Sequence, residues 1–176
     1  MPIYDRSTGK AMKDANSQNR FIQAGKNLEI VATRMRRNDD LCKLLVRNGK
    51  EALSDGKNLT DEERAKAFSE HISTVPVVDK EEDSKTRVIL QIGDIVPMAQ
   101  QGLMYNLVFD VICDVDNWEL DGYTQRPYAI MNELDSVLSN TKMQTWGPVS
   151  FLGATSIKIN ERTLGYTMMF AFSEVQ

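Results

Sequence analysis

The chain has 176 residues and a net charge of −4, and 41% of its residues are hydrophobic and 26% charged, as in a globular protein with its own core. No apolar run approaches the roughly 20 residues of a membrane-spanning helix, and the N-terminal segment lacks the apolar stretch of a signal peptide. The sequence therefore predicts a protein made and kept in a cytoplasm, with no membrane contact.

The charge is divided unevenly along the chain. Residues 1–80 hold 15 Lys and Arg against 12 Asp and Glu, a balance of +3, whereas residues 81–176 hold 6 against 13, a balance of −7. An acidic C-terminal half is a poor match for nucleic acid, which is bound through Lys and Arg. The basic run Arg34, Arg36 and Arg37 could touch phosphate or could complete the dipole at the end of a helix.

The first half of the chain predicts a helical region. Residues 1–17 are polar without periodicity, which is typical of a flexible N-terminal arm. Residues 18–80 form the helical region, and its first helix should reach Arg37 because apolar residues recur every three or four positions on one face. The residues of this face are Leu28, Val31, Ala32 and Met35.

Two shorter helices follow in the same region. Asp39 can cap a helix that ends at Asn48-Gly49. Thr60 and Glu63 have the spacing of a capping box, which predicts a third helix from Asp61 to about His71. Residues 73–86 are expected to form a loop that leads into the second half of the chain.

Residues 81–176 predict a strand–strand–helix–strand–strand domain. The strands are expected at 86–95 and 103–118, and then at 149–152, 157–161 and 166–173, the last two as a hairpin. Pro127 fits the first turn of the helix, which carries an apolar stripe. The fold class is therefore α+β: an antiparallel or mixed sheet packed with helices, plus the N-terminal helical region. The two parts are expected to form one compact unit.

The strand at 103–118 has an apolar face and an acidic one. Asp110, Asp114 and Asp116 alternate with the apolar residues. A row of carboxylates can hold Mg²⁺ or Ca²⁺, as a metal-dependent nuclease would require. Such a row is also what a solvated strand face presents, and the sequence favours that reading, with no metal and no cofactor.

No catalytic constellation stands out in the sequence. The one histidine, His71, has no paired Ser or Cys and fits a structural role at a helix end. Motifs for phosphate cradling and for zinc are missing from the sequence. Cys42 and Cys113 lie in apolar patterns that predict buried free thiols rather than a disulfide. These features predict a protein that is not an enzyme.

Aromatic residues surround Arg126 in the sequence. This group comprises Trp118, Tyr123, Arg126, Tyr128 and Trp146. Aromatic residues and arginine are enriched in protein–protein hot spots. The same residues could equally close the core at the end of the sheet, and the sequence leaves both readings open.

The stretch LVFDVICDVDNWEL, followed by QRPYAIMNELDSVLSN and by GPVSFLGATSIKINERTLGYTMMFAF, resembles tail terminator (tail completion) proteins of long-tailed, contractile-tailed bacteriophages. The shared pattern is an acid–acid–Trp segment at a strand end, an Arg-Pro-Tyr that opens a helix, a Gly-Pro turn and a closing hairpin with Gly-Tyr. The resemblance covers roughly residues 41–176.

The resemblance implies a structural virion protein. Tail terminators form a ring, commonly a hexamer, that caps the tail tube, stops its polymerisation and provides the docking surface for the neck. The implied partners are other copies of the chain, the tail tube protein and a neck or connector protein. DNA would pass through the lumen without specific binding, past a wall that carries Asp110, Asp114 and Asp116. A head-completion or connector-adaptor neck protein, assembled in the same host cytoplasm, is the alternative.

Overall fold

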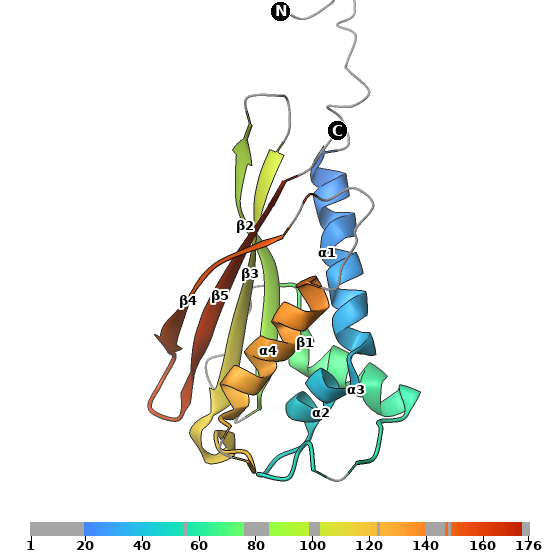
Figure 1. Ribbon diagram of the computed structural model, residues 1–176, viewed down its shortest axis with the longest axis vertical. Helices are drawn as coiled ribbons and strands as arrows, with labels where there is room; N and C mark the ends of the chain where they lie inside the picture. The colour runs from blue at the N-terminus through green and yellow to red at the C-terminus, as the bar shows by residue number, and fades with distance from the viewer. Residues whose placement is uncertain are drawn as a thin grey trace, which may run out of the picture.

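The computed structural model describes residues 20–54, 56–75, 85–98, 103–122, 124–139, 147 and 149–173. These residues form a five-stranded mixed sheet, in the order β1-β2-β3-β5-β4, with four helices on one of its faces (Figure 1). The predicted α+β fold is therefore confirmed. The helices are α1 (Arg20–Arg37), α2 (Asp39–Val46), α3 (Asp61–His71) and α4 (Arg126–Ser139). The strands are β1 (Ile72–Ser73), β2 (Arg87–Pro97), β3 (Leu103–Asp114), β4 (Ser150–Lys158) and β5 (Thr163–Ser173).

The strand–strand–helix–strand–strand order after residue 86 is confirmed. β3 lies at the centre of the sheet and pairs antiparallel with both β2 and β5. Its alternate residues Leu107, Phe109 and Val111 are fully buried under the helices, as the alternation of the sequence predicts. Phe109 meets Phe170 of β5 edge to face at 5.8 Å. β1 adds a short parallel strand beside β2, and its Ser73 falls in the stretch that was predicted to be a loop.

Two strand predictions were wrong. The strand expected to run to residue 118 ends at Asp114, because the Asp114 carboxylate accepts a hydrogen bond from the Asp116 N–H and turns the chain into the 3₁₀ helix η1 (Val115–Asn117). The strands expected at 149–152 and 157–161 are one strand, β4. Its hairpin with β5 turns at Asn160, whose side chain accepts the N–H groups of Arg162 and Thr163.

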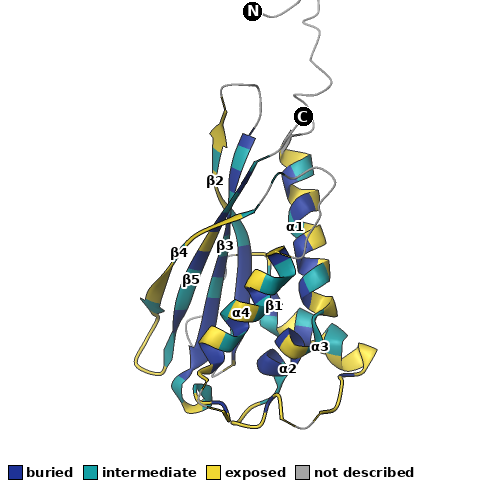
Figure 2. Ribbon diagram, in the orientation of Figure 1, coloured by how far each residue is buried: buried dark blue, intermediate teal, exposed yellow. Residues whose placement is uncertain are grey.

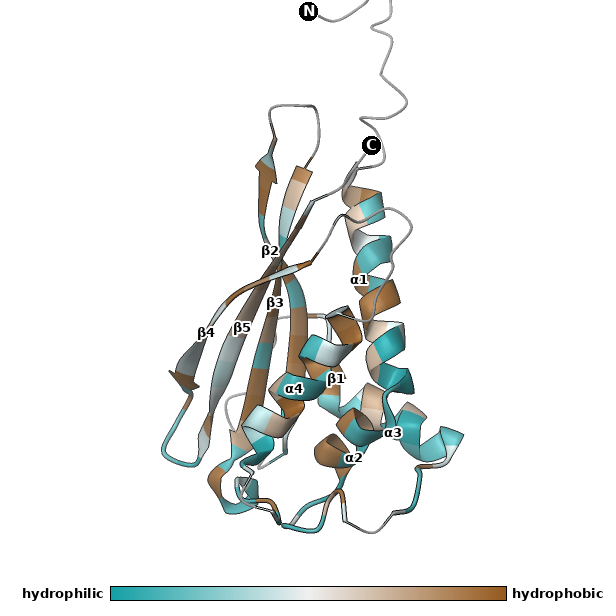
Figure 3. Cartoon of the chain, in the orientation of Figure 1, coloured by the Kyte–Doolittle hydropathy of each residue, from teal (hydrophilic) through white to brown (hydrophobic). Residues whose placement is uncertain are grey.

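The helices end and begin as local chemistry dictates. The predicted capping box of α3 is confirmed: Thr60 accepts from the Glu63 N–H at 3.2 Å and Glu63 accepts from the Thr60 N–H at 2.7 Å. The cap of α2 is Asn38 and not Asp39, since the Asn38 side chain accepts from the Leu41 N–H. In Figure 3, α2 is largely hydrophobic and α3 largely hydrophilic, in keeping with the deep burial of α2.

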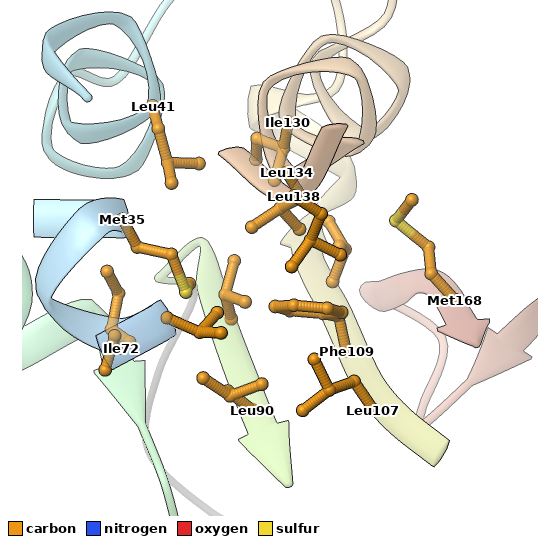
Figure 4. Close-up of a cluster of buried hydrophobic side chains, with 14 of the residues drawn as sticks. Met35, Leu41, Ile72, Leu90, Leu107, Phe109, Ile130, Leu134, Leu138 and Met168 are labelled. Atoms are coloured by element: carbon orange, nitrogen blue, oxygen red, sulfur yellow. The ribbon is translucent and has the colours of Figure 1, made fainter. Parts of the chain in front are cut away.

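One hydrophobic core joins the helices to the sheet. Met35 of α1, Leu41 of α2 and Ile130 of α4 are all fully buried and converge on Leu107 and Phe109 of β3 (Figure 4). Fully burying a side chain of this size stabilises the fold by roughly 1.5–3 kcal/mol. The helical region and the sheet domain therefore fold around the same core. The predicted arm at residues 1–17 lies outside the described residues.

Candidate assembly surfaces

The edge strand β4 is the most exposed strand of the sheet (Figure 2). It pairs with β5 on one side, and no described residue pairs with its other side. Phe151 and Leu152 are 55% and 54% exposed. Between Phe151 and Gly153 the pairing with β5 shifts by one residue, so Leu152 is the extra residue of a bulge. Gly153, at φ +155°, tolerates the backbone that this bulge needs.

The sheet edge on the side of β2 is built differently. β1 pairs with β2 only at Val88 and Ile89. From Leu90 to Pro97 no described residue pairs with the outer side of β2. This outer half carries a bulge between Ile92 and Ile95 and an exposed acid at Asp94. Proline, charge and bulges are features with which natural sheets limit pairing at an edge.

The outer face of helix α1 is a second exposed apolar surface. Phe21, Ile22 and Ile30 are 72%, 58% and 42% exposed. The last turn of the helix carries Arg34 and Arg37, and both line a shallow pocket on this surface. The described residues that line this pocket are Lys26, Glu29, Ile30, Thr33, Arg34 and Arg37. This face combines apolar contact area with positive charge.

The sheet face opposite the helices carries fewer acids than the sequence predicts. Asp110 lies on this face, half-buried, and accepts a hydrogen bond from the Thr167 hydroxyl at 2.5 Å. Asp114 is only 2% exposed and caps η1. Asp116 is exposed in η1 and forms an ion pair with Arg162. The expected row on one strand is therefore wrong, because β3 ends before it is complete. Within the described ranges, no cluster of His, Cys, Asp and Glu could hold a metal ion.

The predicted aromatic group is divided between the surface and the interior. Tyr128 is 48% exposed, and its hydroxyl hydrogen-bonds to that of Tyr166 at 2.6 Å. This bond, together with burial, raises the pKa of Tyr166. Trp118 is half-buried and its indole N–H donates to Gln125 at 3.0 Å. Tyr123 and Trp146 lie outside the described residues.

Arg126 is buried and does not face a partner. It is 0% exposed, and its guanidinium donates to the backbone carbonyls of Leu44 at 2.5 Å, Arg47 at 2.8 Å, Gly49 at 2.5 Å and Asn117 at 2.6 Å. Burial lowers the pKa of this guanidinium. The carbonyls of Leu44 and Arg47 belong to the C-terminal end of α2, where a positive charge meets the negative end of the helix dipole. Placing Arg126 at an interface was therefore wrong: it holds α2 against the start of α4.

The two cysteines, His71 and Asp39 all contribute to packing or to contacts between elements of the fold. Burial raises the pKa of the thiols of Cys42 and Cys113 to about 11 and about 12, so both remain protonated and neither is a ready nucleophile. Both thiols are free, as predicted. His71 Nδ1 lies 2.8 Å from the Thr86 carbonyl and links the end of α3 to the start of β2. Asp39 forms ion pairs with Lys43 of α2 and Arg64 of α3, and so links the two helices.

Phe151 and Leu152 were not predicted to be surface residues. The feature of the sequence that could have indicated an exposed apolar surface is the pair of adjacent large apolar residues in a stretch that has no charge before Lys158. They were assigned to a short strand of unstated position, because sequence does not show which strand lies at an edge. Figure 1 now shows β4 along one side of the molecule and α1 toward the other.

Comparison with known proteins gives the family of the chain. None of the helices described is long and apolar enough to cross a membrane. No curated protein matches the sequence. The model of one family, YomW, matches residues 38–172, which run from α2 through nearly all of β5. The matched region includes all of the sheet except the last residue of β5, and the chain therefore belongs to the YomW family, a phage-derived family of the SPbeta-type Bacillus prophages.

Proposed function

We propose that this protein is a structural virion protein that caps the end of a phage tail tube as a ring, stops tube polymerisation and offers a docking surface to the neck. A ring at a tube end needs two kinds of contact, one with its own copies and one with the tube or neck. The observation that carries the proposal is the presence of two separate exposed apolar surfaces, the β4 edge and the outer face of α1. The phage origin of the family supports the same setting.

The two surfaces suit different tasks. A closed ring is built from heterologous contacts, in which one patch of a copy meets a different patch of the next. The β4 edge offers unpaired backbone groups and the apolar side chains of Phe151 and Leu152 for contacts between copies. The face of α1, with Phe21 and Ile22 in its first turn and basic residues in its last turn, fits an acidic, partly apolar surface on a tube or neck protein.

The charge of the chain favours a lumen that DNA can pass. The second half of the sequence carries a balance of −7, and Asp110 lies on the sheet face opposite to that of the buried residues Phe109 and Val111. The central strands β3 and β5 of this face carry no Lys or Arg, so a wall formed by them offers phosphate no positive charge to bind. In the proposed ring this face points to the lumen. A ring in which Asp110 lies on the outer rim would rule out this part of the proposal.

A tube-length assay tests the function directly. Purified tail tube protein from the same phage is polymerised with and without this protein, and tube lengths are measured by electron microscopy. We expect tubes that stop growing and carry a ring at one end. Tubes of unchanged length with no bound protein would contradict the proposal.

A gene deletion separates the terminator from the alternative neck role. Loss of a terminator gives overlong or unconnected tails, whereas loss of a head-completion or connector-adaptor protein gives heads that leak DNA. A deletion phage with normal tails and empty heads would therefore move the protein from the tail end to the head.

A further inference from the structure

Helix α1 carries positive charge that the rest of the described chain does not neutralise. Lys26, Arg36 and Arg37 are exposed, and no residue in the described ranges forms an ion pair with them. Three exposed bases on other elements do form ion pairs, namely Lys50–Glu119, Lys66–Glu70 and Arg162–Asp116. The charge on α1 is therefore available to a partner.

Two of these bases alternate with apolar residues along one face of α1. Ile22, Lys26, Ile30, Thr33 and Arg37 follow one another at spacings of three or four residues, which places them along one stripe of the helix, the α1 stripe. All five are exposed, and the last four line the shallow pocket. At 1.5 Å per residue, Lys26 and Arg37 lie about 16 Å apart along the helix axis, with Ile30 between them.

The order of residues in the α1 stripe fits a protein better than nucleic acid or a lipid surface. Phosphates would meet the two bases but would leave Ile22 and Ile30 without an apolar contact. Glu29, which lines the same pocket, would repel them. A helix that lies in a lipid surface keeps its apolar residues together on one side, whereas here a base separates them. An acidic segment of a protein offers both carboxylates and apolar contact.

We infer that the α1 stripe binds an acidic segment of the tail tube protein, in which an apolar side chain lies between two carboxylates. The carboxylates pair with Lys26 and Arg37, and the apolar side chain packs on Ile30. This inference rests on the proposed function, which assigns the β4 edge to contacts between copies and needs a second surface for the tube. α1 and β4 lie toward different sides of the molecule (Figure 1), so one copy can make both contacts at once.

Co-sedimentation with preformed tail tubes tests this contact. The wild type is compared with Lys26→Glu/Arg37→Glu. The matched control, Lys66→Glu/Lys85→Glu, changes the charge by the same amount at exposed positions outside α1. We expect the first variant to bind tubes at least about tenfold more weakly and the control to bind as the wild type does. Raising the salt concentration should weaken wild-type binding, because salt screens exposed charges. Equal binding by the two double variants would overturn the inference.

Glu29→Lys should give the opposite result, which a damaged fold cannot produce. Glu29 is the one acidic residue of α1 and lines the pocket, so the substitution replaces a repulsive charge with an attractive one. We expect tighter binding to tubes at low salt than that of the wild type. Unchanged or weaker binding by Glu29→Lys, at an unchanged melting temperature, would overturn the inference.

The same variants separate the tube from other occupants of the stripe. A short DNA duplex and vesicles of phosphatidylglycerol replace the tubes in the binding assay, and light scattering measures self-association. We expect none of these to depend on Lys26 and Arg37. If Lys26→Glu/Arg37→Glu loses binding to DNA or vesicles, or loses self-association, while its binding to tubes is unchanged, the occupant is a different one and the inference is wrong.

The tube-length assay separates this inference from the proposed function. If Lys26→Glu/Arg37→Glu still caps tubes as the wild type does, the α1 contact is wrong while the function stands. If tube binding depends on Lys26 and Arg37 but tubes grow unchanged with the wild type, the contact stands and the function fails.

Discussion

Replacing Arg126 by methionine tests whether this buried guanidinium holds the helical region to the sheet domain. The side chain is 0% exposed and joins four carbonyls that lie 9 to 82 residues away in the sequence. Methionine fills a similar volume but donates no hydrogen bond. The substitution therefore leaves the carbonyls of Leu44, Arg47, Gly49 and Asn117 without their donor.

The magnitude follows from the burial of these bonds. The bond to the Leu44 carbonyl is fully buried, and losing such a partner costs about 1–3 kcal/mol. The other three bonds are part-buried, so water can replace them and each costs about 0.5–1 kcal/mol. Relief of the desolvated charge offsets part of this sum. We expect a net loss of about 3 kcal/mol, a large share of the roughly 5–15 kcal/mol of a typical domain.

Urea unfolding followed by circular dichroism measures this loss. With a slope of about 2 kcal/mol per molar urea, the midpoint of Arg126→Met should fall by about 1.5 M with the slope unchanged. Arg126→Lys keeps the charge but offers three donors for four acceptors, so its midpoint should lie between those of the wild type and Arg126→Met. Lys50→Met, which removes an exposed ion pair with Glu119, is the control and should not move the midpoint. An Arg126→Met midpoint equal to that control would refute the reasoning.

Three further substitutions test local features of the fold. Thr60→Ala removes half of the capping box of α3 and should cost about 1 kcal/mol in urea unfolding; an unchanged midpoint would show that the cap is not needed. Gly165→Ala places a Cβ 1.8 Å from the Val111 carbonyl oxygen, so β3 and β5 must separate, and a loss of about 2 kcal/mol or more is expected, with wild-type stability as the contrary result. Burial lowers the pKa of His71 below its ordinary 6.5, so the fold favours the neutral ring. The stability that this adds is complete above pH 6.5 and is lost as the pH falls from there through the lowered pKa of the folded state. His71→Gln should therefore lower the dependence of the midpoint on pH between about 7.5 and about 5.5, and a slope equal to that of the wild type would contradict this.

The sequence by itself determined the elements whose signals are local. The alternation of apolar and polar residues predicts β3, because side chains on a strand point to opposite faces in turn. The Thr60–Glu63 capping box predicts the start of α3, because its side chains bind backbone groups only three residues away. The α+β class follows from those elements. The family match also extends over α2 to β5, the part in which these signals are strongest.

Only the tertiary structure decided which residues are inside and which strand lies at the edge. Arginine is a residue type that is enriched at interfaces. The hydrogen-bond partners of Arg126 include Leu44 of α2, far away in the sequence, so no local pattern predicts its burial. The alternation of Asp110, Asp114 and Asp116 suggested one acidic face, but the turn at Asp114 divides it. Phe151 and Leu152 are exposed because β4 lies at the end of the strand order, and that order is set by pairing between distant segments.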